Sequence, residues 1–241
     1  MASHPTRAIV LSAGLGTRMR PLTDTRPKPL IEVAGRSLLD RARDKLAVAD
    51  VDVCVVNVHY LADQVEAHVA GWQGTPRPEI SDERAELLET GGGILRALPL
   101  LGEAPFFLLN SDSTWIEGET PALDSLRALW DDGEMDALLL LAERSRAVGF
   151  DGAGDFFRDE VGRLVRRGAR AEAPFAYAGA AILHPRLFTD APQGAFSLNR
   201  LFDVAIAAGR LYGVPMAGTW LHVGTPQAVV DAERAIADTA R

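Results

Sequence analysis

The residues best suited to chemistry lie near the N-terminus, in a loop with two glycines that follows an apolar run. Gly14 and Gly16 precede Arg18, and Lys28 stands between two prolines. Glycines let backbone N–H groups approach a polyphosphate closely, and successive N–H groups form a nest that binds anions. The planar fork of Arg18 suits phosphate oxygens. This spacing predicts a phosphate-binding loop.

Two better-known phosphate loops do not match this segment. The P-loop requires G-x-x-x-x-G-K-[ST], and the chain has no such run. The dinucleotide fingerprint needs a third glycine where Met19 stands, and it holds no basic residue. The glycines alone fit a tight turn between a strand and a helix equally well. Lys28 favours phosphate over that alternative and over a solvated loop lysine, because the flanking prolines stiffen the backbone that carries its charge.

A second candidate follows the apolar run 106–109, where the chain reads Asn110, Ser111, Asp112. Ligands of α/β proteins bind at the carboxyl ends of parallel strands. A carboxylate at this place is therefore a candidate ligand-binding group. The alternative is an aspartate that only caps the following loop.

The elements that position these residues alternate between apolar runs and segments of helical periodicity. Such alternation predicts a mostly parallel sheet covered on both faces, a three-layer α/β/α sandwich with a small antiparallel excursion. We expect strands over 8–13, 51–60, 105–110, 137–142 and 175–183, an excursion over 150–167 and an extended segment over 211–223. We expect helices over 37–49, 61–72, 121–130, 197–208 with Ser197 as N-cap, and 225–241.

The composition is that of a globular protein. The chain has 241 residues, 47% apolar and 24% charged, and a formal net charge of −8. That charge argues against nucleic-acid binding through phosphate neutralisation. No apolar stretch approaches the length of a membrane span, and residues 1–7 lack an apolar signal core. We therefore expect one cytoplasmic domain over 1–241, with no nucleic-acid or membrane partner, and with its one cysteine, Cys54, buried.

Two motifs resemble a known family. Gly14-x-Gly16-Thr17-Arg18-Met19-x-Pro21-Leu22-Thr23, followed by Pro27-Lys28-Pro29-Leu30, resembles the signature of sugar-1-phosphate nucleotidyltransferases. Glu89-Thr90-Gly91-Gly92-Gly93-Ile94 is similar to the family's second Gly-rich segment, which recognises the base. Its TGGG form, after Leu87-Leu88, resembles N-acetylmuramate α-1-phosphate uridylyltransferases, whereas guanylyl-transferring relatives more often resemble G-T-A-G there. The resemblance implies a Rossmann-like nucleotidyltransferase fold.

The resemblance also implies roles for residues in each half of the chain. Residues 1–112 would bind the nucleotide and residues 113–241 the sugar phosphate. The implied nucleotide-binding residues are Leu11, Ala13, Gly14, Gly16, Thr17, Arg18, Lys28, Glu89, Gly91 and Gly92, with Gly91 and Gly92 lying against the base. Those two glycines also suit the first turn of a helix before Ile94, and both interpretations can hold together. Arg18, Lys28 and Asp112 would be the catalytic residues.

Metal binding is where the sequence departs from the family pattern. Asp112 resembles the family's metal aspartate, which implies Mg²⁺, with Mn²⁺ as an alternative. Trp220-Leu221-His222-Val223-Gly224-Thr225 aligns with a W-x-D-x-G-T segment whose aspartate is usually the second ligand. Imidazole is a poor partner for a hard cation. Three alternatives follow for His222. It binds the metal through a water molecule, it does not bind the metal at all, so that the site lacks a second protein ligand, or it only packs near the site.

The implied sugar-binding residues are Asn110, Gly154, Asp155, Tyr177 and Gly179. Tyr177 suits a core-facing strand position equally well. The implied reaction is NTP plus sugar 1-phosphate giving NDP-sugar and pyrophosphate, with UTP and N-acetylmuramate α-1-phosphate as first choice, in cell-wall recycling. The attacking phosphate oxygen is already ionised, so no general base is needed. The expected assembly is a monomer or weak dimer.

Two alternative functions stay open at this point. One is a related transferase, either a mannose-1-phosphate guanylyltransferase or a glucose-1-phosphate thymidylyl- or uridylyltransferase. The other is a nucleotide-sugar-binding module without catalysis, which only His222 suggests.

Overall fold

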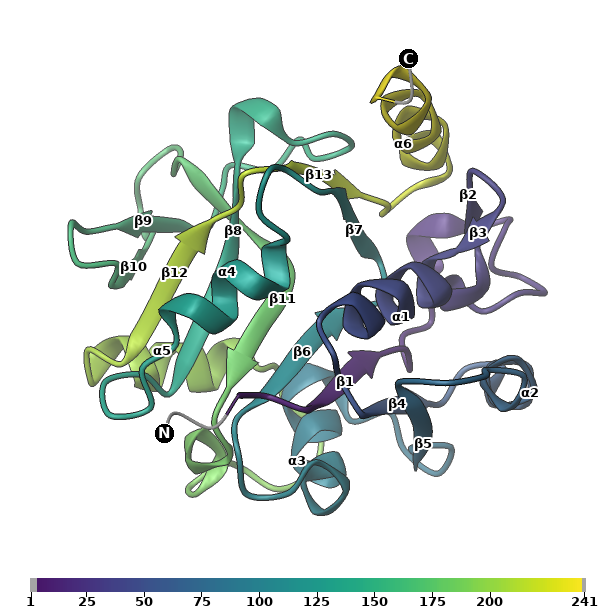
Figure 1. Ribbon diagram of the computed structural model, residues 1–241, viewed down its shortest axis with the longest axis horizontal. Helices are drawn as coiled ribbons and strands as arrows, with labels where there is room; N and C mark the ends of the chain where they lie inside the picture. The colour runs from purple at the N-terminus through teal and green to yellow at the C-terminus, as the bar shows by residue number, and fades with distance from the viewer. Residues whose placement is uncertain (1–3, 240–241) are drawn as a thin grey trace.

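The computed structural model describes residues 4–239, which are built around one large sheet (Figure 1). The main path of the sheet runs β10-β9-β11-β6-β1-β4-β5, and β8 pairs with β11 and with β12. Strands β1, β4, β5 and β6 pair in parallel, as do β8 and β12, whereas β11 is antiparallel to β6 and β8. The strands are β1 (Arg7–Leu11), β4 (Val53–Val58), β5 (Arg77–Asp82), β6 (Phe106–Asn110), β8 (Ala137–Glu143), β9 (Phe156–Arg158), β10 (Leu164–Arg166), β11 (Phe175–Leu183) and β12 (Leu211–Pro215).

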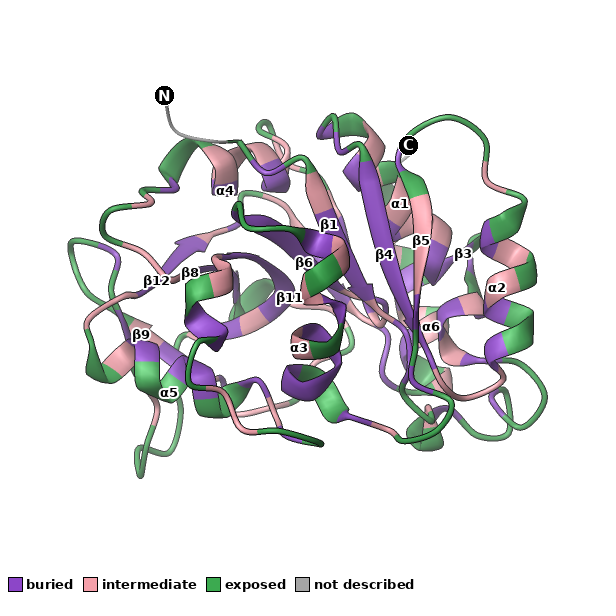
Figure 2. Ribbon diagram, turned by 90° about the horizontal axis from the view of Figure 1, so that it is seen from below, coloured by how far each residue is buried: buried purple, intermediate pink, exposed green. Residues whose placement is uncertain are grey.

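Helices cover both faces of this sheet, because successive strand side chains point to opposite sides. Ala8 and Val10 pack in one apolar cluster with α1, α2 and α4, and Ile9 packs in a second cluster with α3 and α5. Figure 2 shows the buried strands lying between exposed helical surfaces. The helices are α1 (Leu38–Val48), α2 (Ala62–Ala70), α3 (Glu89–Leu101), α4 (Ala122–Leu129) and α5 (Asn199–Ala207). The predicted three-layer, mostly parallel fold is thus confirmed.

Two small sheets and the last helix complete the structure at one end (Figure 1). Strand β7 (Ser113–Ile116) pairs with β13 (Thr219–His222), and β2 (Glu32–Val33) pairs with β3 (Arg36–Ser37). Helix α6 (Pro226–Thr239) packs against β13 and β2 around a third apolar cluster that includes Met19 and Val223. No helix in the described part of the chain is long and apolar enough to cross a lipid bilayer.

Most predicted elements match observed ones within a few residues. Strand β11 spans the predicted 175–183, and the excursion is the β9–β10 hairpin, closed by Asp159 Oδ1, which accepts from Arg163 N at 2.7 Å. Cys54 is buried, as predicted. The final two residues of the predicted helix 225–241, and residues 1–3 of the N-terminal segment, lie outside the described residues.

In the C-terminal half one prediction is confirmed in coarser form and one is wrong in detail. The segment 211–223 is extended, as predicted, but it forms two strands in different sheets, since the chain turns at Gly218, where a Cβ would lie 2.0 Å from Ile116 O. Helix α5 begins after Leu198 instead of Ser197. The Ser197 hydroxyl still accepts a hydrogen bond from Asn199 N at 3.3 Å, so it acts one residue before the helix cap.

Candidate active site

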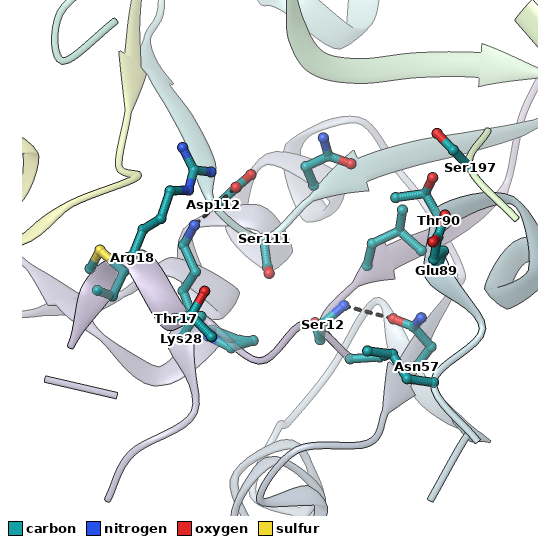
Figure 3. Close-up of a pocket in the computed structure, with 18 residues that line it drawn as sticks. Ser12, Thr17, Arg18, Lys28, Asn57, Glu89, Thr90, Ser111, Asp112 and Ser197 are labelled. Carbon is teal, nitrogen blue, oxygen red and sulfur yellow. Dashed lines mark hydrogen bonds and ion pairs between the residues drawn. The ribbon is translucent and has the colours of Figure 1, made fainter. Parts of the chain in front are cut away.

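A cavity of about 430 Å³ lies where β1 and β6 end, at the carboxyl edge of the parallel strands. Ligands of open α/β sheets bind at this edge. Figure 3 shows the cavity with a charged end around Arg18, Lys28 and Asp112 and a second end around Asn57 and Thr90. The lining residues are Leu11, Ser12, Ala13, Gly14, Gly16, Thr17, Arg18, Met19, Lys28, Pro29, Asn57, Leu87, Glu89, Thr90, Asn110, Ser111, Asp112 and Ser197.

The glycine loop forms one wall of this cavity, and hydrogen bonds on the side away from the cavity hold it in place. Gly16 has a φ of +62°, which favours glycine, and its carbonyl accepts hydrogen bonds from Thr23 Oγ1 at 2.8 Å and Met19 N at 2.9 Å. A Cβ on Gly16 would lie 3.1 Å from Lys28 Cβ, so the loop and the Pro-flanked lysine segment are in close contact. The two parts of the predicted phosphate site therefore meet in the folded chain.

The charged end is organised by an ion pair. Lys28 Nζ lies 3.0 Å from Asp112 Oδ2, with side chains 12% and 27% exposed (Figure 3). Burial acts to raise the pKa of Asp112, but the charges of Lys28, His222 and Arg18 outweigh it and lower that pKa below its usual value. Asp112 is therefore ionised at neutral pH, beside two cations that a phosphate could also engage.

The other end of the cavity is walled by the segment that leads into α3. Leu87, Glu89 and Thr90 line it, and Thr90 Oγ1 accepts from Leu198 N at 2.8 Å. Glu89 holds a positive φ of +59°, a conformation seldom adopted by residues other than glycine. The opposite wall comes from Ser12 and Asn57, at the ends of β1 and β4.

Gly91 and Gly92, which the resemblance places against a base, are not among the residues that line the cavity. A Cβ on Gly91 would lie 2.2 Å from the Phe196 ring, and one on Gly92 would lie 2.3 Å from Gly194 O. These two glycines therefore let the start of α3 approach the loop before α5. Their other predicted role, in the first turn of a helix, matches α3.

His222 lies beside Asp112 but outside the cavity lining. It pairs with Ser113 across the β7–β13 ladder, and Val223 N donates to Asp112 O at 3.1 Å. His222 Nδ1 is buried and has no hydrogen-bond partner among residues 4–239. Burial, together with the charges of Lys28 and Arg18, lowers the pKa of His222 despite the opposing effect of Asp112.

Of the predicted sugar-binding residues, only Asn110 lines the cavity. Gly154 and Asp155 instead hold β9 in place: Asp155 Oδ2 accepts from Tyr177 N at 2.9 Å, and a Cβ on Gly154 would meet Ala173 O at 2.3 Å. This backbone role explains both residue types without a ligand.

Gly179 and Tyr177 lie on β11, under the turn that carries Asp112. Gly179 has a φ of +78°, and a Cβ there would lie 2.6 Å from Ser113 Oγ, so the glycine lets this turn pack against β11. The Tyr177 hydroxyl is buried without a partner among the described residues. Burial and the Asp112 charge raise its pKa, which keeps the phenol protonated.

The polar groups around Asp112 partly fit a divalent cation. No cluster of three or more His, Cys, Asp or Glu side chains with metal-binding geometry occurs among residues 4–239. Mg²⁺ is, however, commonly held by one or two carboxylates plus substrate phosphates. Asp112 suits that arrangement, with His222 as the other nearby donor. The residues therefore fit a cation whose remaining ligands come from a bound polyphosphate.

Several lining residues were not predicted, and Asn57 is the most informative of them. It is a buried polar residue inside the apolar strand β4, VCVVNV. A polar side chain in such a run needs a hydrogen-bond partner, which is a signal the sequence contains. The other unpredicted lining residues are Ser12, Met19, Pro29, Leu87, Thr90, Ser111 and Ser197.

Sequence comparisons give a consistent result. The family model described as nucleotidyl transferase matches residues 7–239. The chain is 48% identical to the N-acetylmuramate alpha-1-phosphate uridylyltransferase of Caulobacter vibrioides, over 99% of this chain and 100% of that protein. It is 34% identical to the enzyme of the same name from Neisseria meningitidis serogroup B, over 91% of this chain and 93% of that protein.

Solved structures show the same fold. A UDP-glucose pyrophosphorylase complexed with UDP-glucose superposes with a TM-score of 0.78 at 17% identity, covering 98% of this chain and 99% of that one. The inositol-1-phosphate CTP transferase from T. maritima gives 0.74 at 17% identity, covering 97% and 98%. At these identities the likeness concerns the fold alone.

Proposed function

Because the chain belongs to the nucleotidyl transferase family, we propose that it transfers a uridylyl group from UTP to N-acetylmuramate α-1-phosphate. The products are UDP-N-acetylmuramate and pyrophosphate, and the reaction serves cell-wall recycling. The observation that carries this proposal is the 48% identity, over the whole length of both chains, to a relative with that activity. The geometry supports it, because the cavity joins a glycine loop, two cations and a carboxylate at the edge where α/β ligands bind.

In this reaction the residues around the cavity position and neutralise phosphates. The sugar-phosphate oxygen attacks the α-phosphorus of UTP, the bond to the β-phosphate breaks, and pyrophosphate leaves with the electron pair. Arg18 and Lys28 stabilise the negative charge that accumulates on the transferred and leaving phosphates. The nucleophile is already ionised, so no side chain has to take its proton.

A divalent cation, Mg²⁺ or Mn²⁺, is proposed as the cofactor. Asp112 would hold it with substrate phosphate oxygens, and it would supply positive charge to the transferred phosphate. Lys28 occupies Asp112 Oδ2 in the ligand-free chain, so phosphate binding would draw the ammonium from the carboxylate toward the substrate. This exchange would leave Asp112 free as the cation arrives with the nucleotide.

The same proposal assigns nucleotide binding and sugar-phosphate binding to different halves of the chain. Residues 1–112 carry nearly all of the cavity lining and would bind the nucleotide, while 113–241 would supply the sugar-phosphate side. A monomer or weak dimer is proposed as the active form. We place the reaction in the cytoplasm, where UTP is available.

The test is a panel of nucleoside triphosphates and sugar 1-phosphates, with pyrophosphate release as the readout. We expect UTP with N-acetylmuramate α-1-phosphate to give the highest kcat/KM, at least tenfold above GTP with mannose 1-phosphate or dTTP with glucose 1-phosphate. A different preferred pair would replace the proposed substrates within the family. Binding of UTP without turnover in either metal would favour the binding module instead.

His222 gives a separate prediction about metal dependence. If His222 occupies a position that suits a carboxylate, His222→Asp adds a hard oxygen ligand and should lower the Mg²⁺ concentration for half-maximal rate, by about threefold or more. His222→Ala should weaken activation by Mn²⁺, which accepts imidazole better than Mg²⁺ does. The measurement is a titration of both metals for the three proteins at saturating UTP. Superimposable curves would exclude a metal role for His222.

A further inference from the structure

Three buried polar groups form a chain of hydrogen bonds behind the end of the cavity that lies around Asn57 and Thr90. Ser12, Asn57 and Glu83 are 2%, 2% and 0% exposed. Ser12 N donates to Asn57 Oδ1 at 2.6 Å, and Asn57 Nδ2 donates to Glu83 Oε1 at 2.7 Å. The first of these bonds is drawn in Figure 3. Glu83 itself is not among the residues that line the cavity.

This chain of bonds connects the two walls that face each other across the cavity. Glu83 Oε2 accepts from Leu88 N at 3.4 Å, inside the segment that supplies Leu87, Glu89 and Thr90 to the lining. On the other side, the bond from Ser12 holds the start of the glycine loop. The separation of the walls is therefore fixed through Asn57 and Glu83.

The pattern of donors suits a carboxylate at position 83. Asn57 must turn its oxygen to the Ser12 N–H, so its NH₂ group faces Glu83, and Leu88 presents a second N–H. A carboxylate satisfies both donors, because it presents one acceptor oxygen to each of them. Gly93 completes the fit, because a Cβ there would lie 2.7 Å from Glu83 Oε1.

This carboxylate is costly for the folded chain. Burial raises the pKa of Glu83 above its usual value, although the hydrogen bonds from Asn57 and Leu88 and the charges of Arg96 and His59 act against this shift. Removing a carboxylate from water opposes folding. Its place between the two cavity walls therefore points to a role in ligand binding.

We propose that Glu83 is a positioning residue that, through Asn57 and Leu88, sets the geometry of the pocket for the nucleotide base. The assignment of that end to the base rests on the proposed function. The consequence is specific: loss of the carboxylate loosens nucleotide binding and base selection, while the phosphate chemistry at Arg18, Lys28 and Asp112 is unaffected.

The first variant is Glu83→Gln, which keeps the size of the side chain but has one acceptor for two donors. We expect the KM for UTP and the Kd of UTP to rise about tenfold. The kcat and the KM for the sugar phosphate should stay within twofold, and the preference for UTP over CTP should fall. Equal changes in all constants, or no change in the affinity for UTP, would overturn the proposal.

The second variant restores the pairing of donors and acceptors but moves the carboxylate from position 83 to position 57. In Asn57→Asp/Glu83→Gln, the new carboxylate accepts from Ser12 N and from the new amide, whose oxygen accepts from Leu88 N. Asn57→Asp alone places two carboxylates in contact and should be the worst of the three. Recovery of most of the lost UTP affinity in the double variant would support the proposal, and additive losses would contradict it.

Asp40→Asn is the matched control, because Asp40 is a largely buried carboxylate that also accepts two side-chain bonds, from His68 and Trp72 at 2.9 Å. It lies outside the cavity and should lower the Tm without changing the KM for UTP. Calorimetric binding of UTP needs no turnover. If the parent protein does not bind UTP, the proposed function fails; if it binds UTP and Glu83→Gln binds equally well, only the positioning role fails.

Discussion

Replacing Asp112 by Asn is expected to lower kcat/KM by about a thousandfold or more and to remove the dependence of the rate on Mg²⁺. Asn keeps the shape of the side chain but lacks the charge that holds a divalent cation and pairs with Lys28 at 3.0 Å. The measurement is pyrophosphate release with UTP and N-acetylmuramate α-1-phosphate over a range of Mg²⁺ concentrations. Activity that keeps its Mg²⁺ dependence would reduce Asp112 to a residue that caps its loop.

The chain offers a matched control for this variant in a second carboxylate–lysine pair. Lys45 Nζ lies 2.9 Å from Glu117 Oε1, with side chains 13% and 36% exposed, and neither residue lines the active-site cavity. Glu117→Gln therefore breaks a comparable ion pair elsewhere in the molecule. We expect it to keep kcat/KM within about twofold, which separates loss of an ion pair from loss of a metal ligand.

The fold was predictable where strands are buried on both faces. Segments such as 53–56 and 137–142 are continuous apolar runs, which identify interior strands of an α/β sheet without reference to any ligand. Strand β5 was missed because it lies at the sheet edge and reads RPEISD, with charged residues and a proline. Edge strands tolerate such residues, so composition does not reveal them.

The site was predictable only where a residue is recognisable by type and by its immediate neighbours. Lys28 and Asp112 satisfy that condition, and the fold brings them to 3.0 Å although 84 positions separate them. Gly91 and Gly92 do not, because what they accommodate is a loop about 100 residues later in the chain. A glycine in the sequence indicates that another group approaches the backbone closely, but it does not indicate whether that group is a base or a phenylalanine ring.

Glu83 illustrates the same limit for polar groups. In the sequence it is one acid in a charged stretch, SDERAE, typical of a solvated surface loop. In the structure it is fully buried, because the ends of β4 and β5 and the start of α3 enclose it. Its role depends on one donor 26 positions earlier, Asn57, and one five positions later, Leu88, and no local pattern specifies that they meet at one carboxylate.

Lys28→Ala is expected to lower kcat/KM by about 30- to 1,000-fold, or about 2–4 kcal/mol of transition-state stabilisation, with the fold intact. The side chain is only 12% exposed, so its ammonium is partly desolvated and acts strongly on phosphates in the cavity. Removing it also leaves Asp112 without its partner, which should raise the pKa of that carboxyl toward its usual range.

Lys28→Arg and Lys45→Ala complete the Lys28 experiment. The arginine keeps the charge but has a planar head, and should recover only part of the rate if a compact ammonium has to move between Asp112 and the substrate. Lys45 is equally buried and equally paired, so Lys45→Ala should cost stability and little activity. Near-parental kcat/KM for Lys28→Ala would mean that Arg18 and the cation neutralise the phosphates without it. The ion pair with Asp112 would then serve only to hold the ligand-free loop in place.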